Sequence, residues 1–231
     1  MAKKNFYAVK YGVDPDTHET VSNVILKSWA ETERLIKRVP GATYSGFFTE
    51  DEAKAYIGTG DPLKNKAEGN YPKDCLHCYV DGSFNEGLAN YSFALVCVQN
   101  GKVVGLDYGQ GNNPEAVSMR QIGGELLGAI KALIYAQKNG HKEVVVFHDY
   151  KGTAYHATGY WKRDTEFSRI YFDWMQTFFK RYSDVKVHFV KVDAHTGDDF
   201  NEIADGLAKK ALGIEPNKVF FKVLEKHQLK L

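Results

Sequence analysis

The order of strand and helix patterns after residue 75 constrains the fold most strongly. Three strand patterns come first, at residues 76–84, 91–99 and 102–108, and Asn100-Gly101 between the last two is a strong signal for a two-residue hairpin. Apolar residues at helical spacing then cover 118–138, and a Val-Val-Val-Phe run in 143–147 predicts a buried strand. A helical stretch at 153–181, a strand at 185–192 and a helix at 201–212 follow. This order predicts an α/β unit, a mixed five-stranded sheet flanked by helices.

Residues 1–58 predict a smaller, separate unit. Strand patterns at 6–11, 24–26 and 44–48 are accompanied by helical patterns at 28–39 and 49–58, as in a small α+β domain with a three-stranded sheet. Residues 59–74 contain glycine and proline among polar residues without apolar periodicity, so we expect a flexible linker there. The second unit then covers 75–213, and 214–231 form a tail with a weak apolar run at 219–221.

Composition excludes some classes of protein and leaves others open. The net charge of +1 gives no evidence for a nucleic-acid partner, so such a claim must rest on local patches and a site. No apolar run approaches the roughly 20 residues that span a bilayer. The first residues lack the apolar core and cleavage site of a signal peptide. We therefore expect a cytoplasmic protein without a membrane partner, and a monomer.

The three cysteines are expected to be reduced thiols. An odd number of cysteines without a leader argues against a disulfide framework. The C-x-x-C spacing of Cys75 and Cys78 invites a zinc or redox interpretation. A strand sends residues three apart to opposite faces, and no second pair completes four zinc ligands. We favour two separate, non-functional thiols.

Three acidic residues occupy positions where a charge costs free energy. Strand alternation puts Asp149 on the apolar face of its strand, and helical spacing puts Glu125 within the apolar stripe of its helix. Asp81 directly follows an apolar strand segment. Taken singly, Asp149 and Asp81 could cap helices or turns, and Glu125 could pair with a lysine. Together they favour a hard divalent cation, and all-oxygen ligands select Mg²⁺ or Mn²⁺ over zinc.

Around these acids the chain resembles ribonuclease H. Four motifs occur in the same order across residues 75–213, which is far more specific than a lone Asp-Gly-Ser would be. The motifs are Tyr79-Val80-Asp81-Gly82-Ser83, Gly124-Glu125-Leu126-Leu127-Gly128-Ala129, His148-Asp149-Tyr150, and Ala194-His195-Thr196-Gly197-Asp198 followed by Asn201-Glu202-Ile203-Ala204-Asp205.

The resemblance implies an endonuclease that hydrolyses the RNA strand of RNA–DNA hybrids. Asp81 would bridge two Mg²⁺ ions. Asp205 would help hold the ion that activates the attacking water. Glu125 and Asp149 would help hold the ion that stabilises the leaving oxygen. His195 would assist proton transfer or product release, unless it is an ordinary loop histidine. The products would carry a 5′-phosphate and a 3′-hydroxyl, and Mn²⁺ could replace Mg²⁺.

Recognition of the 2′-hydroxyl separates RNA from DNA. The resemblance implies contacts from Gly82, Ser83 and Glu125, and the further substrate-binding candidates are Gln121, Arg120, Lys151 and Asn201. Here the chain departs from the family: Lys151 replaces a common amide, Gln121 stands where asparagine is common, and no basic helical protrusion is present. Arg120 and Lys151 could equally be solvated surface residues.

Residues 1–58 resemble the small hybrid-binding, viroplasmin-like domain found before many ribonucleases H. The similarity lies in Phe6-Tyr7-Ala8-Val9, Ser28-Trp29 and Phe48-Thr49-Glu50-Asp51-Glu52-Ala53. It implies an aromatic clamp of Trp29 and Tyr44, with Lys27, Lys37 and Arg38 near phosphate; alternatively, Trp29 packs the small core. Eight basic and eight acidic residues make this unit neutral, so we expect weak hybrid binding.

Two alternatives from other classes remain open. One is a non-catalytic hybrid-binding protein with a decayed site, which the presence of all four acids and His195 disfavours. The other keeps the ribonuclease H fold with a different reaction, as in transposase-like or exonuclease relatives. The hybrid-binding unit argues against the second alternative.

Overall fold

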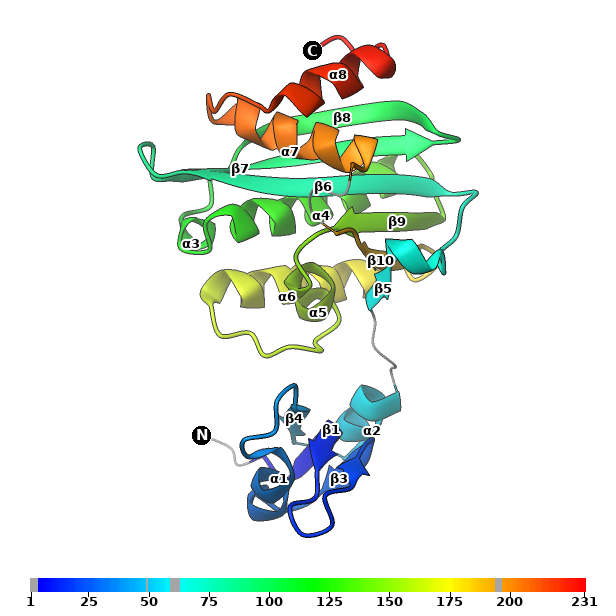
Figure 1. Ribbon diagram of the computed structural model, residues 1–231. Coiled ribbons are helices and arrows are strands. Elements are labelled where there is room, and N and C mark those ends of the chain that lie inside the picture. Colours follow the sequence, from blue (N-terminus) through cyan, green and yellow to red (C-terminus); the bar gives the residue numbers. More distant parts are fainter. Residues whose placement is uncertain (1–3, 49, 59–62, 194–196) are drawn as a thin grey trace. The chain divides into compact units, whose positions relative to one another are not determined.

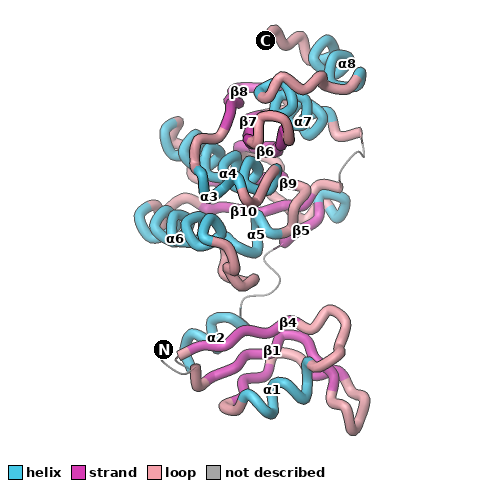
Figure 2. Tube along the Cα trace, turned by 90° about the vertical axis from the view of Figure 1, so that its left-hand side faces the viewer, coloured by secondary structure: helices cyan, strands magenta, loops and turns pink. Residues whose placement is uncertain are grey.

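The structure is a computed structural model that describes residues 4–48, 50–58, 63–193 and 197–231. It divides into two compact units, Met1–Pro62 with Tyr160–Lys162, and Leu63–Gly159 with Arg163–Leu231. Figures 1 and 2 show their elements. Within the described ranges, no helix is long and apolar enough to cross a membrane.

The small unit is built around strand β1 (Phe6–Val13). This strand pairs antiparallel with β3 (Val24–Leu26) and β4 (Thr43–Phe47), and its far end pairs with the two-residue β2 (Thr20–Val21). Helices α1 (Trp29–Ile36) and α2 (Glu50–Gly58) complete the unit. The predicted small α+β domain is confirmed, with the short β2 added to the three expected strands. Its core contains Ala8, Ala53 and Tyr56, with Phe6, Ile25, Phe47 and Ile57 packed against them.

The large unit contains a mixed sheet with one strand more than predicted. Its strand order is β5 (Leu63–Asn65), β10 (Lys186–Lys191), β9 (Glu143–His148), β6 (Leu76–Asn85), β7 (Asn90–Gln99) and β8 (Lys102–Gln110). The first four strands run parallel, and β6, β7 and β8 form an antiparallel meander. The additional strand β5 lies in the segment 59–74, where the sequence predicted a flexible linker.

The turn between β7 and β8 is the predicted two-residue hairpin. Asn100 and Gly101 have φ angles of 52° and 72°, both in the left-handed region. Asparagine and glycine tolerate this region better than other residues, and two such residues in succession match the right-handed twist of the flanking strands.

Helices α4 (Gln121–Lys138) and α7 (Asp199–Ala211) cover opposite faces of the sheet. Tyr79 on β6 packs in one core with Ile203 and Leu207 of α7. Its neighbour Val80 lies against Gly128 of α4, where an added Cβ would come within 3.0 Å of the Val80 Cβ. Successive residues of a strand point to opposite faces, so the two helices sandwich β6. Figure 1 shows both helices alongside this strand.

The remaining helices are α3 (Pro114–Val117), α5 (Gly152–Ala157), α6 (Glu166–Arg181) and α8 (Lys218–Lys226). The last of these lies in the predicted tail. Its N-cap Asn217 accepts a hydrogen bond from the Phe220 amide at 2.9 Å. Phe220 and Val223 are buried in the same core as the α7 residues, so α8 is part of the large unit.

All three cysteines are buried free thiols. Cys75 belongs to the core that α7 covers. The Cys78 sulfur lies 3.6 Å from that of Cys97, its partner across β6 and β7. The two thiols of the C-x-x-C spacing are thus both buried, Cys78 within β6 and Cys75 directly before it.

Candidate active site

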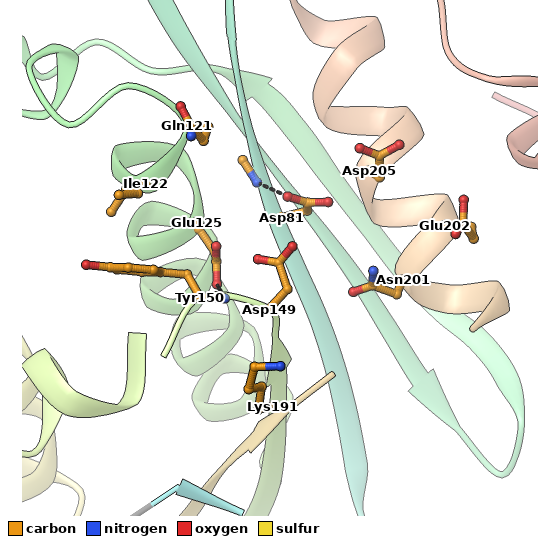
Figure 3. Close-up of a pocket in the computed structure, with 11 residues that line it drawn as sticks. Asp81, Gln121, Ile122, Glu125, Asp149, Tyr150, Lys191, Asn201, Glu202 and Asp205 are labelled. Atoms are coloured by element: carbon orange, nitrogen blue, oxygen red, sulfur yellow. Dashed lines mark hydrogen bonds between the residues drawn. The ribbon is translucent and has the colours of Figure 1, made fainter. Parts of the chain in front are cut away.

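Asp81 and Asp149 lie level with each other on neighbouring strands. The parallel register of β6 and β9 sets Tyr79 opposite Phe147, with their rings stacked 4.5 Å apart. Two residues further on come Asp81, still within β6, and Asp149, directly after the end of β9. Residues two apart share a face, so both carboxylates lie on the face that α7 covers. Figure 3 shows the two carboxylates close together.

Glu125 reaches the same place from α4. Its predicted burial in the apolar stripe is confirmed, since only 4% of the residue is exposed. The Oε1 atom accepts hydrogen bonds from the Tyr150 amide at 3.1 Å and the Thr153 hydroxyl at 2.9 Å. These two donors hold the carboxylate at the end of β9, beside Asp149.

His148 supports this arrangement through the backbone of Tyr150. Its Nδ1 lies 2.9 Å from the carbonyl oxygen of Tyr150, and a carbonyl can only accept, so Nδ1 carries the proton. Burial lowers the pKa of His148 to about 4, so the imidazole is neutral. The histidine therefore positions the Tyr150 backbone, which in turn donates to Glu125.

Gly82 allows β6 and α4 to approach closely at the site. A Cβ atom on Gly82 would lie 2.1 Å from the carbonyl oxygen of Gln121 and 2.5 Å from the Glu125 nitrogen. Both are backbone atoms that cannot move aside. Only glycine permits this contact, which brings Asp81 and Glu125 together.

Helix α7 supplies the fourth acid. Asp205 lies on this helix, and its Oδ2 accepts from the Lys209 ammonium at 2.7 Å. Asn201 and Glu202, one turn earlier, are both buried. The helix begins at Asp198, whose side chain accepts from the amides of Phe200 and Asn201.

The four acids line one pocket of about 450 Å³ (Figure 3). They come from β6, α4, the end of β9 and α7, which are far apart in the sequence. The lining residues are Asp81, Gly82, Gln121, Ile122, Glu125, Asp149, Tyr150, Lys191, Asn201, Glu202 and Asp205.

The pocket holds an excess of negative charge. Five lining residues are carboxylates, and Lys191 is the one lysine or arginine among the lining residues of the described pocket. Burial, followed by the charges of Asp149 and Asp205, raises the pKa of Asp81 well above its usual value. Burial, followed by the charges of Asp149 and Asp81, does the same to the pKa of Glu125. A cation bound here would relieve this repulsion.

The donor set fits a hard divalent cation, because carboxylate and amide oxygens are the ligands that Mg²⁺ and Mn²⁺ prefer. Across the part of the chain that the structure describes, no three histidine, cysteine, aspartate or glutamate side chains already lie close enough together to hold a metal ion. The acids therefore share a pocket without forming a closed cage.

Several predicted substrate residues lie outside the pocket. Gly82, Gln121 and Asn201 line it, whereas Ser83, Arg120 and Lys151 do not. Arg120 forms an ion pair with Glu86 and has a φ of 56°, so it lies before α4 and outside a helix, although the predicted helix 118–138 included it. His195 lies outside the described residues.

Two charged lining residues were missed by the sequence prediction. Lys191 ends β10, which runs parallel to β9, and open α/β sheets usually place their sites at the carboxyl ends of such strands. Glu202 precedes Asp205 by three residues and so shares its helix face. Both residues could have been found by applying these two rules, on strand ends and on shared helix faces, beyond the four predicted acids. The other two lining residues that were not predicted are Ile122 and Tyr150. Each is adjacent in the sequence to a predicted residue.

The small unit carries an exposed aromatic patch. Trp29, at the start of α1, is 44% exposed and does not belong to the described core of that unit. Its ring centroid lies 5.9 Å from that of Tyr44 on β4 and 5.6 Å from that of Tyr7 on β1. The structure thus brings Trp29 and Tyr44 together and adds Tyr7, which the sequence interpretation omitted.

The three basic residues predicted for this unit are exposed. Lys27 lies near the Phe6 ring, at 5.8 Å from its centroid. Lys37 follows α1 at the end opposite Trp29 and pairs with Glu33 at 3.6 Å. Arg38 comes directly after it, with a φ of 59°.

Two family models match the chain. The model described as ribonuclease H1 N-terminal domain covers residues 5–57, and the model described as reverse transcriptase-like covers residues 79–211. A search of curated proteins found no match.

Solved structures of ribonucleases H match part of the chain. Ribonuclease H1 from Halobacterium salinarum is 21% identical over 60% of this chain and 97% of its own, with a TM-score of 0.50. A ribonuclease H domain from Desulfitobacterium hafniense is 38% identical over 62% of this chain and 94% of its own, with a TM-score of 0.31. LC11-RNase H1, from compost, solved with an RNA/DNA hybrid, is 17% identical over 59% of this chain and 99% of its own, with a TM-score of 0.48.

The first of these likenesses supports the ribonuclease H fold, and the expected mixed sheet flanked by helices is confirmed. Since the reverse transcriptase-like model alone matches more than half of the 231 residues, the chain belongs to the reverse transcriptase-like family of ribonucleases H, and it carries an N-terminal domain of the ribonuclease H1 type.

Proposed function

We propose that this protein is an endonuclease that hydrolyses the RNA strand of RNA–DNA hybrids with two divalent metal ions. One observation carries the proposal: Asp81, Glu125, Asp149 and Asp205, from four separate elements, line one partly enclosed pocket. Such a buried gathering of carboxylates destabilises the fold unless a cation compensates the charge, and groups perturbed in this way cluster at functional sites. Family membership supports phosphodiester hydrolysis as that function.

The four acids would hold the ions through their oxygens, with Asp81 between the other three. When bound, a pair of Mg²⁺ or Mn²⁺ ions supplies a nucleophile at neutral pH and neutralises charge on the phosphate. The Tyr150 amide and Thr153 hydroxyl keep Glu125 oriented for this task, since both donate to its Oε1. Lys209 compensates part of the charge on Asp205.

Recognition of RNA would come from the pocket wall beside Asp81. The Gly82 backbone and the Gln121 and Asn201 amides line the pocket and can exchange hydrogen bonds with a 2′-hydroxyl. Arg120 and Lys151 lie outside it, so any phosphate contact they make would be with more distant nucleotides. His195 keeps its proposed role in proton transfer or product release.

The first test is cleavage of a hybrid with labelled RNA in the presence of Mg²⁺. The expected products carry 5′-phosphate and 3′-hydroxyl ends, which ligation and phosphatase sensitivity can identify. Duplex RNA and duplex DNA of the same sequence are the controls and should remain uncut. Equal cutting of duplex RNA would contradict the proposed specificity.

The small unit is proposed to hold the hybrid through Trp29, Tyr7 and Tyr44. Replacing Trp29 with alanine should weaken hybrid binding by the whole chain about fivefold, because one exposed aromatic contact contributes about 1 kcal/mol. Fluorescence anisotropy with a labelled hybrid measures this change. Tyr11→Ala, an exposed aromatic on the same strand as Tyr7, is the control. Unchanged affinity in Trp29→Ala would remove this unit from substrate binding.

A further inference from the structure

Lys66 contacts the large unit's core from a segment that the sequence assigned to a linker. It follows β5 directly and opens a 3₁₀ turn (Lys66–Glu68). Its ammonium donates to the Tyr79 hydroxyl at 2.7 Å and forms an ion pair with Asp198. It also lies 4.6 Å and 4.8 Å from the ring centroids of Tyr79 and Phe147. Hydrogen bond, ion pair and ring faces together fix the position of this charge.

Asp198 links this lysine to the helix of the fourth acid. One oxygen, Oδ1, accepts from the amides of Phe200 and Asn201 at 3.2 Å and 3.4 Å, which caps the start of α7. The other oxygen, Oδ2, faces Lys66. The Asp198 side chain is only 13% exposed, so it cannot turn to solvent without losing both sets of partners. Lys66 therefore contacts the residue that caps the start of α7.

The same segment also borders the pocket through β10. Asn65 on β5 lies opposite Lys191, the lysine that lines the pocket, and Leu63 lies opposite Phe189. The three residues of β5 thus pair with the last three residues of β10. The segment 63–68 thus contacts β10, β6 and the N-cap of α7, and all three of these elements carry pocket residues.

We propose that Lys66 is a positioning residue for the active site and acts through Asp198. By fixing the start of α7, it holds Asn201 and Asp205 at the pocket, where small displacements lower the rate of a positioned reaction. The expected effect of Lys66 on the reaction rate rests on the proposed hydrolytic function. Its structural consequence, a firmly held α7 N-terminus, stands without that function.

A double-mutant cycle on the full chain tests the proposal. Lys66→Met removes the charge and keeps much of the stem, and it should lower kcat on a hybrid about tenfold with KM changed less than twofold. Lys66→Arg should restore most of kcat. Asp198→Asn keeps a capping oxygen but loses the charge, so Lys66→Met should have little further effect in that background. Lys64→Met, the same change on β5, is the matched control and should leave kcat unchanged.

Hydrogen exchange gives a readout that does not depend on activity. In Lys66→Met, the amides of Phe200 and Asn201 should exchange about tenfold faster, while those of β6 and β9 keep their rates. Unchanged exchange at these amides would overturn the proposal, as would a kcat within twofold of the wild type. Equal kcat losses from Lys66→Met in both backgrounds would also overturn it, because the lysine would not act through Asp198. If the wild type cuts no hybrid, the proposed function fails and the exchange rates alone decide whether Lys66 positions α7.

Discussion

Asp81→Asn is expected to lower the cleavage of RNA–DNA hybrids at least about a thousandfold. Asparagine keeps the shape of the side chain but removes the charge at the centre of the carboxylate group, beside Asp149 and Asp205. Charge stabilisation by bound metal ions contributes several kcal/mol, and about 4 kcal/mol corresponds to a thousandfold in rate. Single-turnover cleavage of a hybrid with end-labelled RNA measures the loss.

Hybrid binding should stay within a few-fold in the same variant, because Asp81 holds metal ions and the small unit supplies separate contacts. Asp107→Asn provides the matched control: Asp107 lies on β8 of the same sheet and pairs with Lys131 at the surface. Its rate should equal that of the wild type. A rate for Asp81→Asn within tenfold of the wild type would contradict the assignment of the site.

Asp149→Asn is expected to stabilise the protein when divalent cations are chelated, by about 3–6 °C in Tm at pH 8. Burial and the Asp149 charge raise the pKa values of Asp81 and Glu125 above those of the unfolded chain. An acid with a raised folded-state pKa contributes stability below its unfolded pKa, and this contribution is lost as pH rises through the folded value. Starting from ordinary values of 3.8 and 4.5, the wild type therefore loses stability as pH rises from about 4.

The gain in Tm of Asp149→Asn over the wild type should consequently grow between pH 5 and pH 8 and shrink when Mg²⁺ is added. Thermal unfolding followed by circular dichroism, with chelator or Mg²⁺, measures both trends. Asp184→Asn is the control and should change the stability in the opposite direction, since the hydrogen bond from Lys142 lowers the pKa of Asp184. A variant less stable than the wild type at every pH would show that the carboxylates do not repel one another in the fold.

Local signals predicted those parts of the fold that depend on neighbouring residues in the sequence. The Asn100-Gly101 turn, the alternation around Asp149 and the helical spacing around Glu125 each reflect such a local rule. Asp81, Glu125 and Asp149 were identified because a charge beside an apolar core is costly wherever the chain folds, whereas Asp205 was identified from the resemblance to ribonuclease H. For this reason their meeting in one pocket could be anticipated before the structure was known.

Features that depend on a distant partner could not be predicted in this way. The strand β5 has only three residues, Leu63-Lys64-Asn65, and no alternation, so its extended form depends on pairing with β10. The break before α4 occurs at Arg120, an arginine with positive φ that no glycine or proline announces. Helix α8 is short, and the burial of its Phe220 depends on packing against the core that α7 residues form.

Anomalous diffraction from crystals grown with Mn²⁺ and a cleavage-resistant hybrid tests the central claim most directly. Two Mn²⁺ peaks roughly 3.5–4 Å apart are expected in the pocket, with Asp81 between them and Glu125, Asp149 and Asp205 around them. The RNA strand should cross the pocket, with one phosphate at the ions. A pocket without manganese beside a bound hybrid, or the DNA strand lying at the acids, would contradict the account.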